Sequence, residues 1–246
     1  GSCVNEPNTI SGNLRKLNNN ENGILNLGQG GNGPLIEYAT LREYLPIKKV
    51  KRVLLIYYEG NDLWDLLGEL ENKILNNYFK DKNYSQNLVS RKKEIQELLF
   101  SKLEQNILKE RKLNKFNISN FLKFKNIRTL TLERFFSESV PKEFKNILQF
   151  SKKLVKKNNS KLYFVYLPEY SRYSGNRNTK KFKNYYKVIE IVKSLKIPII
   201  NVNKELFERH EDPLSLFPFR VGSHYTENGY RLVAETIFNK IKKLEK

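Results

Sequence analysis

Residues 51–62 read KRVLLIYYEGND, and the apolar run within them, 53–58, decides the fold class. Apolar residues are continuous here instead of alternating with polar ones, which is typical of a strand buried on both faces of a parallel sheet. Similar runs occur at 24–27 (ILNL), 161–167 (KLYFVYL) and 197–202 (IPIINV). Because longer stretches with helical spacing separate these runs, the sequence predicts parallel βαβ units in an α/β domain.

Helical periodicity is clear on both sides of these strands. A helix is expected after Pro34, because proline is common in the first turn of a helix. The chain ends in a second predicted helix, from about Glu227 to Lys243. The positions at helical spacing are Ile36, Ala39, Thr40 and Tyr44 in the first helix, and Tyr230, Val233, Ile237 and Ile241 in the second.

The connection between the runs at 51–58 and 161–167 is about a hundred residues long, far more than a crossover helix needs. We interpret it as a helical insertion at about 62–160 within one domain, 1–246, because no Gly/Pro/Ser-rich linker bounds it. Its apolar stripes are expected to pack on the sheet layer, with its lysines in solvent. These stripes are Ile95, Leu98, Leu99, Leu103 and Ile107, and then Phe144, Leu148, Leu154 and Val155.

Composition narrows the possible functions. The net charge is +19, yet residues 1–90 are balanced, so 91–246 carry the whole excess. Lysine outnumbers arginine 33 to 12 and asparagine occurs 30 times, which indicates an AT-rich genome more than a phosphate-binding surface, where arginine is favoured. We therefore expect no nucleic-acid partner. Apolar runs are too short for a membrane span, and the single cysteine, Cys3, excludes an internal disulfide or a cysteine-based zinc site.

Three segments carry candidate chemistry, and each follows a predicted strand or precedes the last helix. They are NLGQGGNG (26–33), EGND (59–62) and HYTENGYRLVAE (224–235). Ligands bind at the carboxyl ends of parallel strands, so these segments should share one edge of the sheet. A glycine lets a backbone N–H approach a developing oxyanion, and an asparagine carboxamide can donate to it. Each segment also has a purely structural interpretation: a strand-to-helix turn for 26–33, a helix N-cap for 59–62 and a structural histidine for His224. The other histidine, His210, is assigned to a helix end.

In this order the three blocks resemble the SGNH (GDSL-like) hydrolase family. The resemblance implies a three-layer α/β/α fold around a parallel, flavodoxin-like sheet, and a serine esterase-type mechanism without a cofactor or metal. It also implies that the Gly31 N–H and the Asn61 side chain donate to the oxyanion and that His224 is the general base. Gly30 is the rival of Gly31 for the first role. The implied substrate is a small-molecule or glycan ester, such as an O-acetylated carbohydrate.

Two features depart from the family's pattern. The Gly-Asp-Ser block that carries the nucleophile is absent, and residues 1–12 resemble the segment directly after such a block. We therefore expect the nucleophile and the first strand to precede residue 1, a gap between the strands at 24–27 and 51–58, and no activity in the chain as given. The family usually has an aspartate three residues before the histidine, where this chain has Val221. Asp212 or Glu211 could supply that carboxylate; otherwise a Ser–His dyad would operate.

Other functions stay open at this point. Carbohydrate O-acetyl transfer uses the same acyl-enzyme as ester hydrolysis and is the close rival. A non-catalytic SGNH-like binding module is favoured by Val221, and a basic polyanion binder by the net charge. The polar, tyrosine-rich loop at 168–180 either covers a site or is disordered. Nothing in the sequence defines a compartment.

Overall fold

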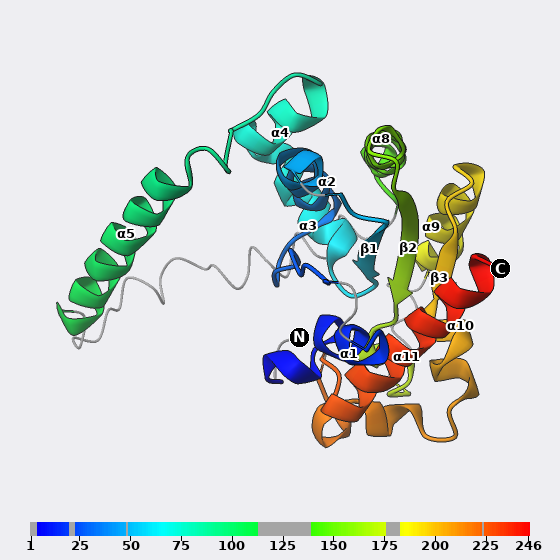
Figure 1. Ribbon diagram of the computed structural model, residues 1–246. Helices are drawn as coiled ribbons and strands as arrows, with labels where there is room; N and C mark the ends of the chain where they lie inside the picture. Colours follow the sequence, from blue (N-terminus) through cyan, green and yellow to red (C-terminus); the bar gives the residue numbers. More distant parts are fainter. Residues whose placement is uncertain (1–3, 20–22, 48, 113–138, 176–182, 223) are drawn as a thin grey trace.

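The fold is built on a small parallel sheet. The computed structural model describes residues 4–19, 23–47, 49–112, 139–175, 183–222 and 224–246. Within them the strands are β1 (Arg52–Tyr58), β2 (Lys161–Leu167) and β3 (Ile199–Asn201), in the order β1-β2-β3 (Figure 1). The strands at 51–58 and 161–167 are thus confirmed, and all pairings are parallel.

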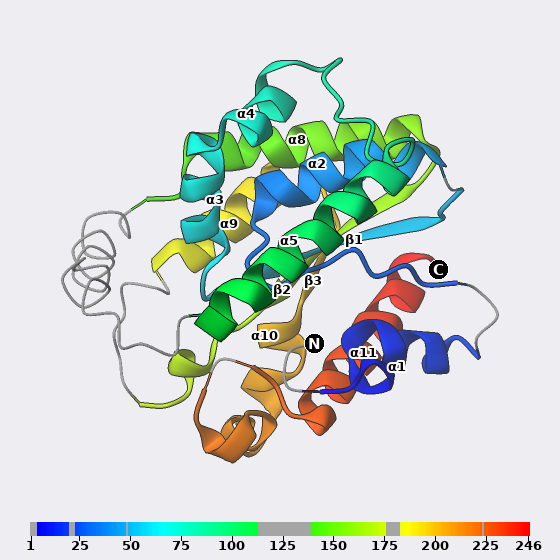
Figure 2. The ribbon, with the colours of Figure 1, turned by 90° about the vertical axis from the view of Figure 1, so that its left-hand side faces the viewer.

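Helices cover both faces of this sheet, an arrangement compatible with an α/β/α layout (Figures 1 and 2). One face packs on α2, α3, α8 and α9, and the other on α1, α10 and α11. The helices are α1 (Ile10–Leu17), α2 (Pro34–Tyr44), α3 (Asp62–Glu71), α4 (Lys73–Lys80), α5 (Lys92–Lys112), α8 (Lys142–Lys157), α9 (Lys183–Ser194), α10 (Val202–Glu205) and α11 (Glu227–Leu244).

Local sequence explains where several helices begin. The Thr226 hydroxyl accepts a hydrogen bond from the Gly229 N–H and caps α11, whose start and extent are confirmed. The Asn72 side chain caps α4 in the same way. Asn201 caps α10, so β3 ends there and is shorter than the expected strand at 197–202. The predicted helix after Pro34 is confirmed as α2.

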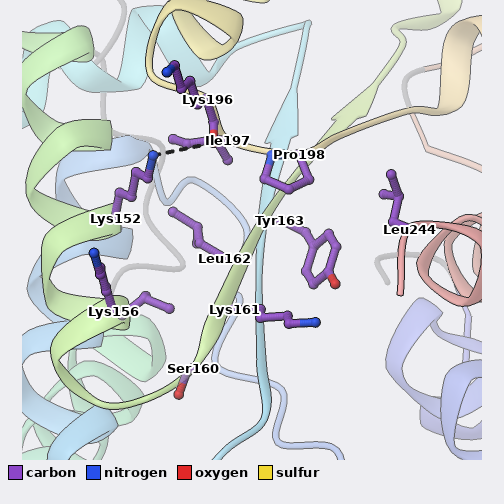
Figure 3. A pocket seen from close by; sticks show the side chains of 11 residues that line it. Lys152, Lys156, Ser160, Lys161, Leu162, Tyr163, Lys196, Ile197, Pro198 and Leu244 are labelled. Carbon is purple, nitrogen blue, oxygen red and sulfur yellow. Dashed lines mark hydrogen bonds between the residues drawn. The ribbon is translucent and has the colours of Figure 1, made fainter. Parts of the chain in front are cut away.

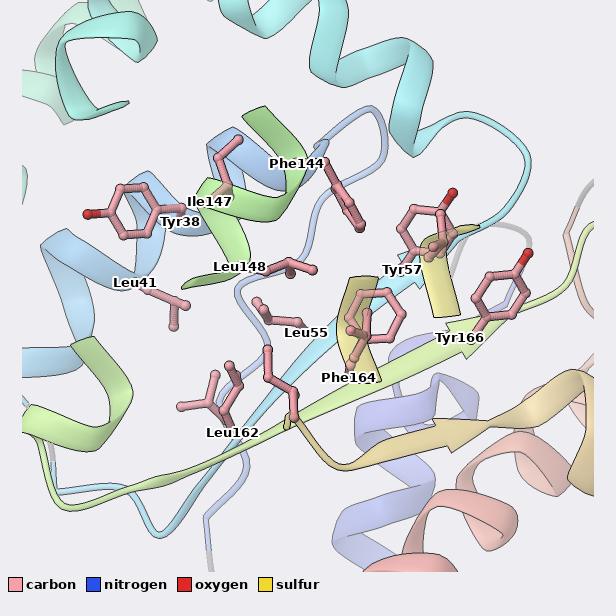
Figure 4. Packing of buried hydrophobic residues seen from close by; sticks show 14 of the residues in the cluster. Tyr38, Leu41, Leu55, Tyr57, Phe144, Ile147, Leu148, Leu162, Phe164 and Tyr166 are labelled. Carbon is pink, nitrogen blue, oxygen red and sulfur yellow. The ribbon is translucent and has the colours of Figure 1, made fainter. Parts of the chain in front are cut away.

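The core on the α2/α8 face is rich in aromatic rings (Figure 4). The Phe144 ring, fully buried on α8, meets the edge of Tyr57 from β1 and of Phe164 from β2. Burying a phenylalanine in such a setting stabilises the fold by several kcal/mol. The predicted apolar stripe of 144–155 is therefore confirmed as core, with Phe144, Leu148 and Val155 buried and Leu154 packed beside them.

The expected strand at 24–27 is wrong. Residues 23–29 form no regular structure, and Leu25 and Leu27 are exposed. A strand needs backbone hydrogen bonds to a neighbouring strand. Among the described residues, no strand pairs with this segment. The Ile24 carbonyl instead accepts two hydrogen bonds from the Arg15 guanidinium on α1, at 3.1 and 2.8 Å.

The predicted packing of the first stripe of the insertion on the sheet layer is also wrong. The described part of the insertion is mostly helical (residues 113–138 lie outside), but α5 stands away from the body (Figure 1). The physical reason is that the apolar residues of α5 are not confined to one face of the helix. Leu98 and Phe100 lie about 200° apart around the helix. Of the side chains of α5 that the structure describes, four apolar ones are exposed and between 51% and 58% accessible: Leu98, Leu99, Phe100 and Leu103. Ile95 of the predicted stripe is half-buried, and Ile107 lies outside the described side chains.

Two phenylalanines, one in the core and one on exposed α5, test this difference in packing. Phe144→Ala is expected to lower the free energy of unfolding by about 3–5 kcal/mol, because it opens a cavity between α8 and the sheet. Phe100→Ala, the same change on α5, is expected to alter it by less than about 0.5 kcal/mol. Urea denaturation measures both. Equal losses in the two variants would show that α5 packs on the body.

Candidate functional site

The carboxyl edge of the sheet gathers the polar residues that follow the strands. Glu59 follows β1, Pro168 and Glu169 follow β2, and Asn201 ends β3. Because the strands are parallel, these ends lie side by side. This is the edge on which the sequence places its candidate site.

The glycine segment forms a tight turn before α2. The Asn32 N–H donates to the Gln29 carbonyl at 3.2 Å, and Gly31 has φ +80°. A positive φ at the third residue of such a turn is typical of a type II turn, which favours glycine there. Gly30 and Gly31 are both exposed, so their backbone is accessible.

Asn61 is the N-cap residue of α3, directly beyond the end of β1. Its half-buried carboxamide donates a hydrogen bond of 2.5 Å to Asp65 Oδ2 and makes no cap hydrogen bond of its own. An asparagine side chain has two N–H donors, so one remains for a ligand after the bond to Asp65. The side chain can therefore be held by Asp65 and still donate.

Glu69 joins the glycine turn to α3. Its buried carboxylate accepts a hydrogen bond from the Gly33 N–H at 2.6 Å and from the Leu35 N–H at 2.9 Å. A Cβ at Gly33 would lie 2.9 Å from both carboxylate oxygens and 3.0 Å from the Asp65 Cβ, so only glycine fits. The turn that holds Gly31 and the helix that begins with Asn61 are thus fixed to each other.

The contact between α2 and α3 concentrates carboxyl groups. Burial, and then the charge of Glu69, raise the pKa of Glu37 to about 8. Burial and the charge of Glu37 raise the pKa of Asp62 well above its usual range, although Asp62 accepts the Tyr58 N–H at 2.8 Å. Burial also raises the pKa of Asp65 and Glu69, partly offset by their hydrogen bonds. At least one of these groups is therefore protonated at neutral pH.

His224 is exposed on the loop before α11, and its neighbour Tyr225 fixes that loop to the sheet edge. The Tyr225 hydroxyl donates to the Pro168 carbonyl at 2.6 Å. A Cβ at Gly60 would lie 3.0 Å from the Glu169 Cγ, so the end of β1 touches the loop after β2. The chain neighbours of Asn61 and of His224 therefore contact two consecutive residues of one loop, Glu169 and Pro168 respectively. Convergence of the Asn61 carboxamide, the glycine backbone and the His224 ring around one cleft stays a prediction.

Among the described residues, neither carboxylate proposed to orient His224 is hydrogen-bonded to its ring. Both Asp212 oxygens accept hydrogen bonds from the Arg220 guanidinium, at 2.6 and 2.9 Å, and this partner holds the pKa of Asp212 below its usual range. Glu211 is exposed, and His210 follows a short helix as expected. In the part of the chain that the structure describes, the His224 imidazole has no hydrogen bond.

A strained turn precedes His224, and sequence reasoning did not find it. Phe219 and Arg220 both have positive φ, 53° and 59°, which non-glycine residues rarely adopt. Such strain costs of order 1–3 kcal/mol for each residue and is typical of functional sites. Buried Phe217 and the Arg220–Asp212 pair hold the turn, and the Phe219 ring is 96% accessible beside the histidine loop.

The loop after β2 is fastened over the edge by a buried ion pair. The Glu59 carboxylate accepts hydrogen bonds from the Arg172 guanidinium, the Tyr166 hydroxyl and the Glu169 N–H. Burial lowers the pKa of Arg172, but the hydrogen bond and charge of Glu59 outweigh burial and raise it overall. Of the loop at 168–180, the described part, 168–175, therefore covers the carboxyl edge. No local sequence pattern indicates this pair, because its partners lie 113 residues apart.

A hollow of about 320 Å³ lies at the opposite edge, where β2 and β3 begin (Figure 3). Lys152, Lys156, Lys161 and Lys196 line it. Parallel topology brings the carbonyl ends of α8 and α9 to this edge, and these negative helix ends disfavour an anion. The Lys152 ammonium indeed donates to the Leu195 carbonyl at 2.6 Å. Lys152 therefore compensates the end of α9, Lys161 lies 4.0 Å from the Glu245 carboxylate, and this hollow is not the candidate site.

Comparisons of the chain with protein-family models, with curated proteins and with solved structures found no match. Among the described residues, no group of three or more His, Cys, Asp or Glu side chains could hold a metal ion. None of the helices described is both long and apolar enough to cross a membrane.

The carboxyl cluster predicts an unusual dependence of stability on pH. A raised pKa means that the folded state holds its proton more tightly than the unfolded chain. This stabilisation is complete below the ordinary glutamate pKa of 4.5 and is lost as pH rises through about 8. Glu37→Gln should make the fold more stable at pH 8 than the wild type and flatten the fall between pH 5 and 8. Urea denaturation at both pH values measures this, with exposed Glu71→Gln as control; parallel curves for the wild type and Glu37→Gln would contradict it.

The buried ion pair makes a second prediction for this edge. Arg172→Met keeps the apolar stem but leaves the Glu59 carboxylate buried without a positive partner, which is expected to cost about 3–5 kcal/mol of unfolding free energy. Arg231→Met removes the exposed pair with Glu235 on α11 and should cost less than about 1 kcal/mol. A similar small loss for both in thermal or urea denaturation would refute the fastening role of Arg172.

Proposed function

We propose that this chain forms the oxyanion and histidine part of a serine ester hydrolase of the SGNH (GDSL-like) type. Its substrate is a small-molecule or glycan ester, with an O-acetylated carbohydrate as the leading candidate. Asn61 and the Gly31 N–H stabilise the oxyanion, and His224 is the general base. The nucleophilic serine belongs to a Gly-Asp-Ser block, which the 246 residues do not contain.

One observation supports this proposal above the others. Gly60, next to Asn61, touches the loop after β2 at Glu169, and Tyr225, next to His224, hydrogen-bonds Pro168 of the same loop. Gly60 and Tyr225, 165 positions apart in the chain, thereby contact one loop at the carboxyl edge of the parallel sheet, where such folds bind their ligands. The glycine turn that carries Gly31 is connected to α3, the helix that Asn61 precedes, by the hydrogen bonds of Glu69 to Gly33 and Leu35.

The proposed reaction has two steps. The serine Oγ attacks the ester carbonyl carbon while His224 takes the Oγ proton, and the carbonyl oxygen becomes an oxyanion facing Asn61 and Gly31. The C–O bond to the alcohol then breaks, and the histidine returns the proton to the leaving alcohol. Water repeats the sequence on the acyl-enzyme and releases the acid. If a sugar hydroxyl replaces that water, the same site performs O-acetyl transfer.

The finer fold assignment belongs to the same proposal. A flavodoxin-like sheet has the strand order 2-1-3-4-5, which places the serine-bearing strand on the free side of β1. The carboxyl end of that strand would lie between the glycine turn and Asn61.

A non-catalytic binding module is the second candidate function, because one observation favours it. Val221 occupies the position expected for an acid, and the Asp212 carboxylate is engaged by Arg220. Without an orienting carboxylate the imidazole would be a poorer base, since the carboxylate holds its tautomer and stabilises the imidazolium. A binding module would keep the fold and its loops but hydrolyse nothing.

The two functions are separated by assaying the complete reading frame, including its Gly-Asp-Ser block, on p-nitrophenyl acetate. His224→Ala should lower kcat about 10²–10⁴-fold and Asn61→Ala about 10²–10³-fold, because each removes a group needed in the transition state. His210→Ala is the matched control and should leave kcat unchanged. The 246-residue chain alone should show no turnover. Wild-type protein without activity supports the binding module, and activity insensitive to His224→Ala ends the hydrolase proposal.

A further inference from the structure

We infer that Glu69 and Asp65, neither of them a group that touches substrate, are positioning residues that set the separation of the two oxyanion donors. This inference rests on the proposed function for its catalytic meaning, but its structural content can be tested without it. The observation behind it is a row of three polar side chains on α3 that holds both donor segments.

The row follows from helix geometry. Asn61, Asp65 and Glu69 are spaced by four residues, so they lie on one face of α3. Asp65 accepts from the Asn61 carboxamide, and Glu69 accepts from the backbone before and within the first turn of α2. One face of one helix thus contacts the Asn61 side chain and the backbone at Gly33, two residues after Gly31.

Glu69 acts as the cap that α2 does not supply itself. The N-cap residue of α2 is Gly33, which has no side chain to accept from the free N–H groups of the first turn. Each Glu69 oxygen takes one of these N–H groups, at 2.6 and 2.9 Å. Hydrogen bonds from backbone donors to a carboxylate are about twice as strong as neutral ones. The position of the glycine turn is therefore set by α3.

Glycine at position 33 makes this close approach possible. With a Cβ, Gly33 would clash with the Glu69 carboxylate and crowd the Asp65 Cβ at 3.0 Å. Gly31 is only two residues earlier, in a turn closed by the Gln29–Asn32 hydrogen bond. A shift of the Gly33 N–H would therefore be transmitted directly to the proposed donor.

The separation of the donors matters because an oxyanion site works only when both donors meet one oxygen atom. Donors must lie about 2.7–3.1 Å from the developing charge, and a misplacement of 1 Å costs as much as 10²-fold in rate. Holding Asn61 and the backbone at Gly33 from one face of α3 links the positions of the two donor segments.

The structural part is tested first on the 246-residue chain by NMR hydrogen exchange of backbone amides. Glu69→Gln keeps the size of the side chain but leaves one oxygen for two N–H donors, so exchange at Gly33 and Leu35 should quicken about 10- to 100-fold. The matched control is Glu71→Gln, an exposed change at the end of the same helix, which should leave both amides unchanged. Unchanged exchange in Glu69→Gln overturns the inference, whether or not the protein is an esterase.

The catalytic part is tested in the complete reading frame. Glu69→Gln and Asp65→Asn should each lower kcat about 10- to 100-fold with little change in KM, because the donors act mainly in the transition state. Asp65→Asn serves as the second variant if Glu69→Gln does not fold. A larger KM with kcat retained would overturn the positioning role. Wild-type protein without activity would refute the proposed function only, since the exchange result stands separately.

Discussion

The backbone hydrogen bonds that β2 makes on both of its sides are the constraint on which the rest of the structure depends. β2 pairs in parallel with β1 along seven residues and with β3 along three. Parallel pairing sends every helical connection over a face of the sheet and brings the carboxyl end of every strand to one edge. The residues of that edge meet for this reason alone, although they come from distant parts of the chain.

Two buried carboxylates then organise the loops at this edge, and they do so by different physical means. Glu59 is neutralised by the positive charge of Arg172, so it joins the loop after β2 to the end of β1. Among the described residues, the hydrogen-bond partners of Glu69 are backbone N–H groups, so dipoles stabilise its charge. The charge of Glu69 is the more strongly affected by nearby groups, because the carboxyl groups of Glu37, Asp62 and Asp65 lie at the same interface.

Much of the fold could be predicted from local patterns, and the errors have physical causes. Continuous apolar runs identified β1 and β2, Pro34 marked the start of α2, and helical spacing placed α11 from about Glu227. The run at 24–27 has the same composition as a strand, yet a strand needs a partner that periodicity does not supply. For α5, the spacing of leucines predicted a helix correctly but not whether anything covers it.

The candidate site divides in a similar way. The sequence correctly placed Asn61 directly after a strand and His224 directly before the last helix, because strand ends and helix starts have sequence signals. Asp65 and Glu69 could have been found from their four-residue spacing after Asn61. Arg172 and the strained Phe219 turn could not, because a buried ion pair and a positive φ depend on contacts between segments far apart in sequence.

One consequence of the sheet concerns its behaviour in concentrated solution. Within the described residues, β1 has a hydrogen-bonded neighbour on one side only, so a row of backbone N–H and C=O groups on its other side lacks a strand. A long, apolar strand edge is a template on which another chain can add a strand. Only Arg52, at the beginning of β1, brings a charge to this strand. We therefore expect the 246-residue chain to self-associate edge to edge, and a peptide with alternating apolar residues to suppress that association by occupying β1.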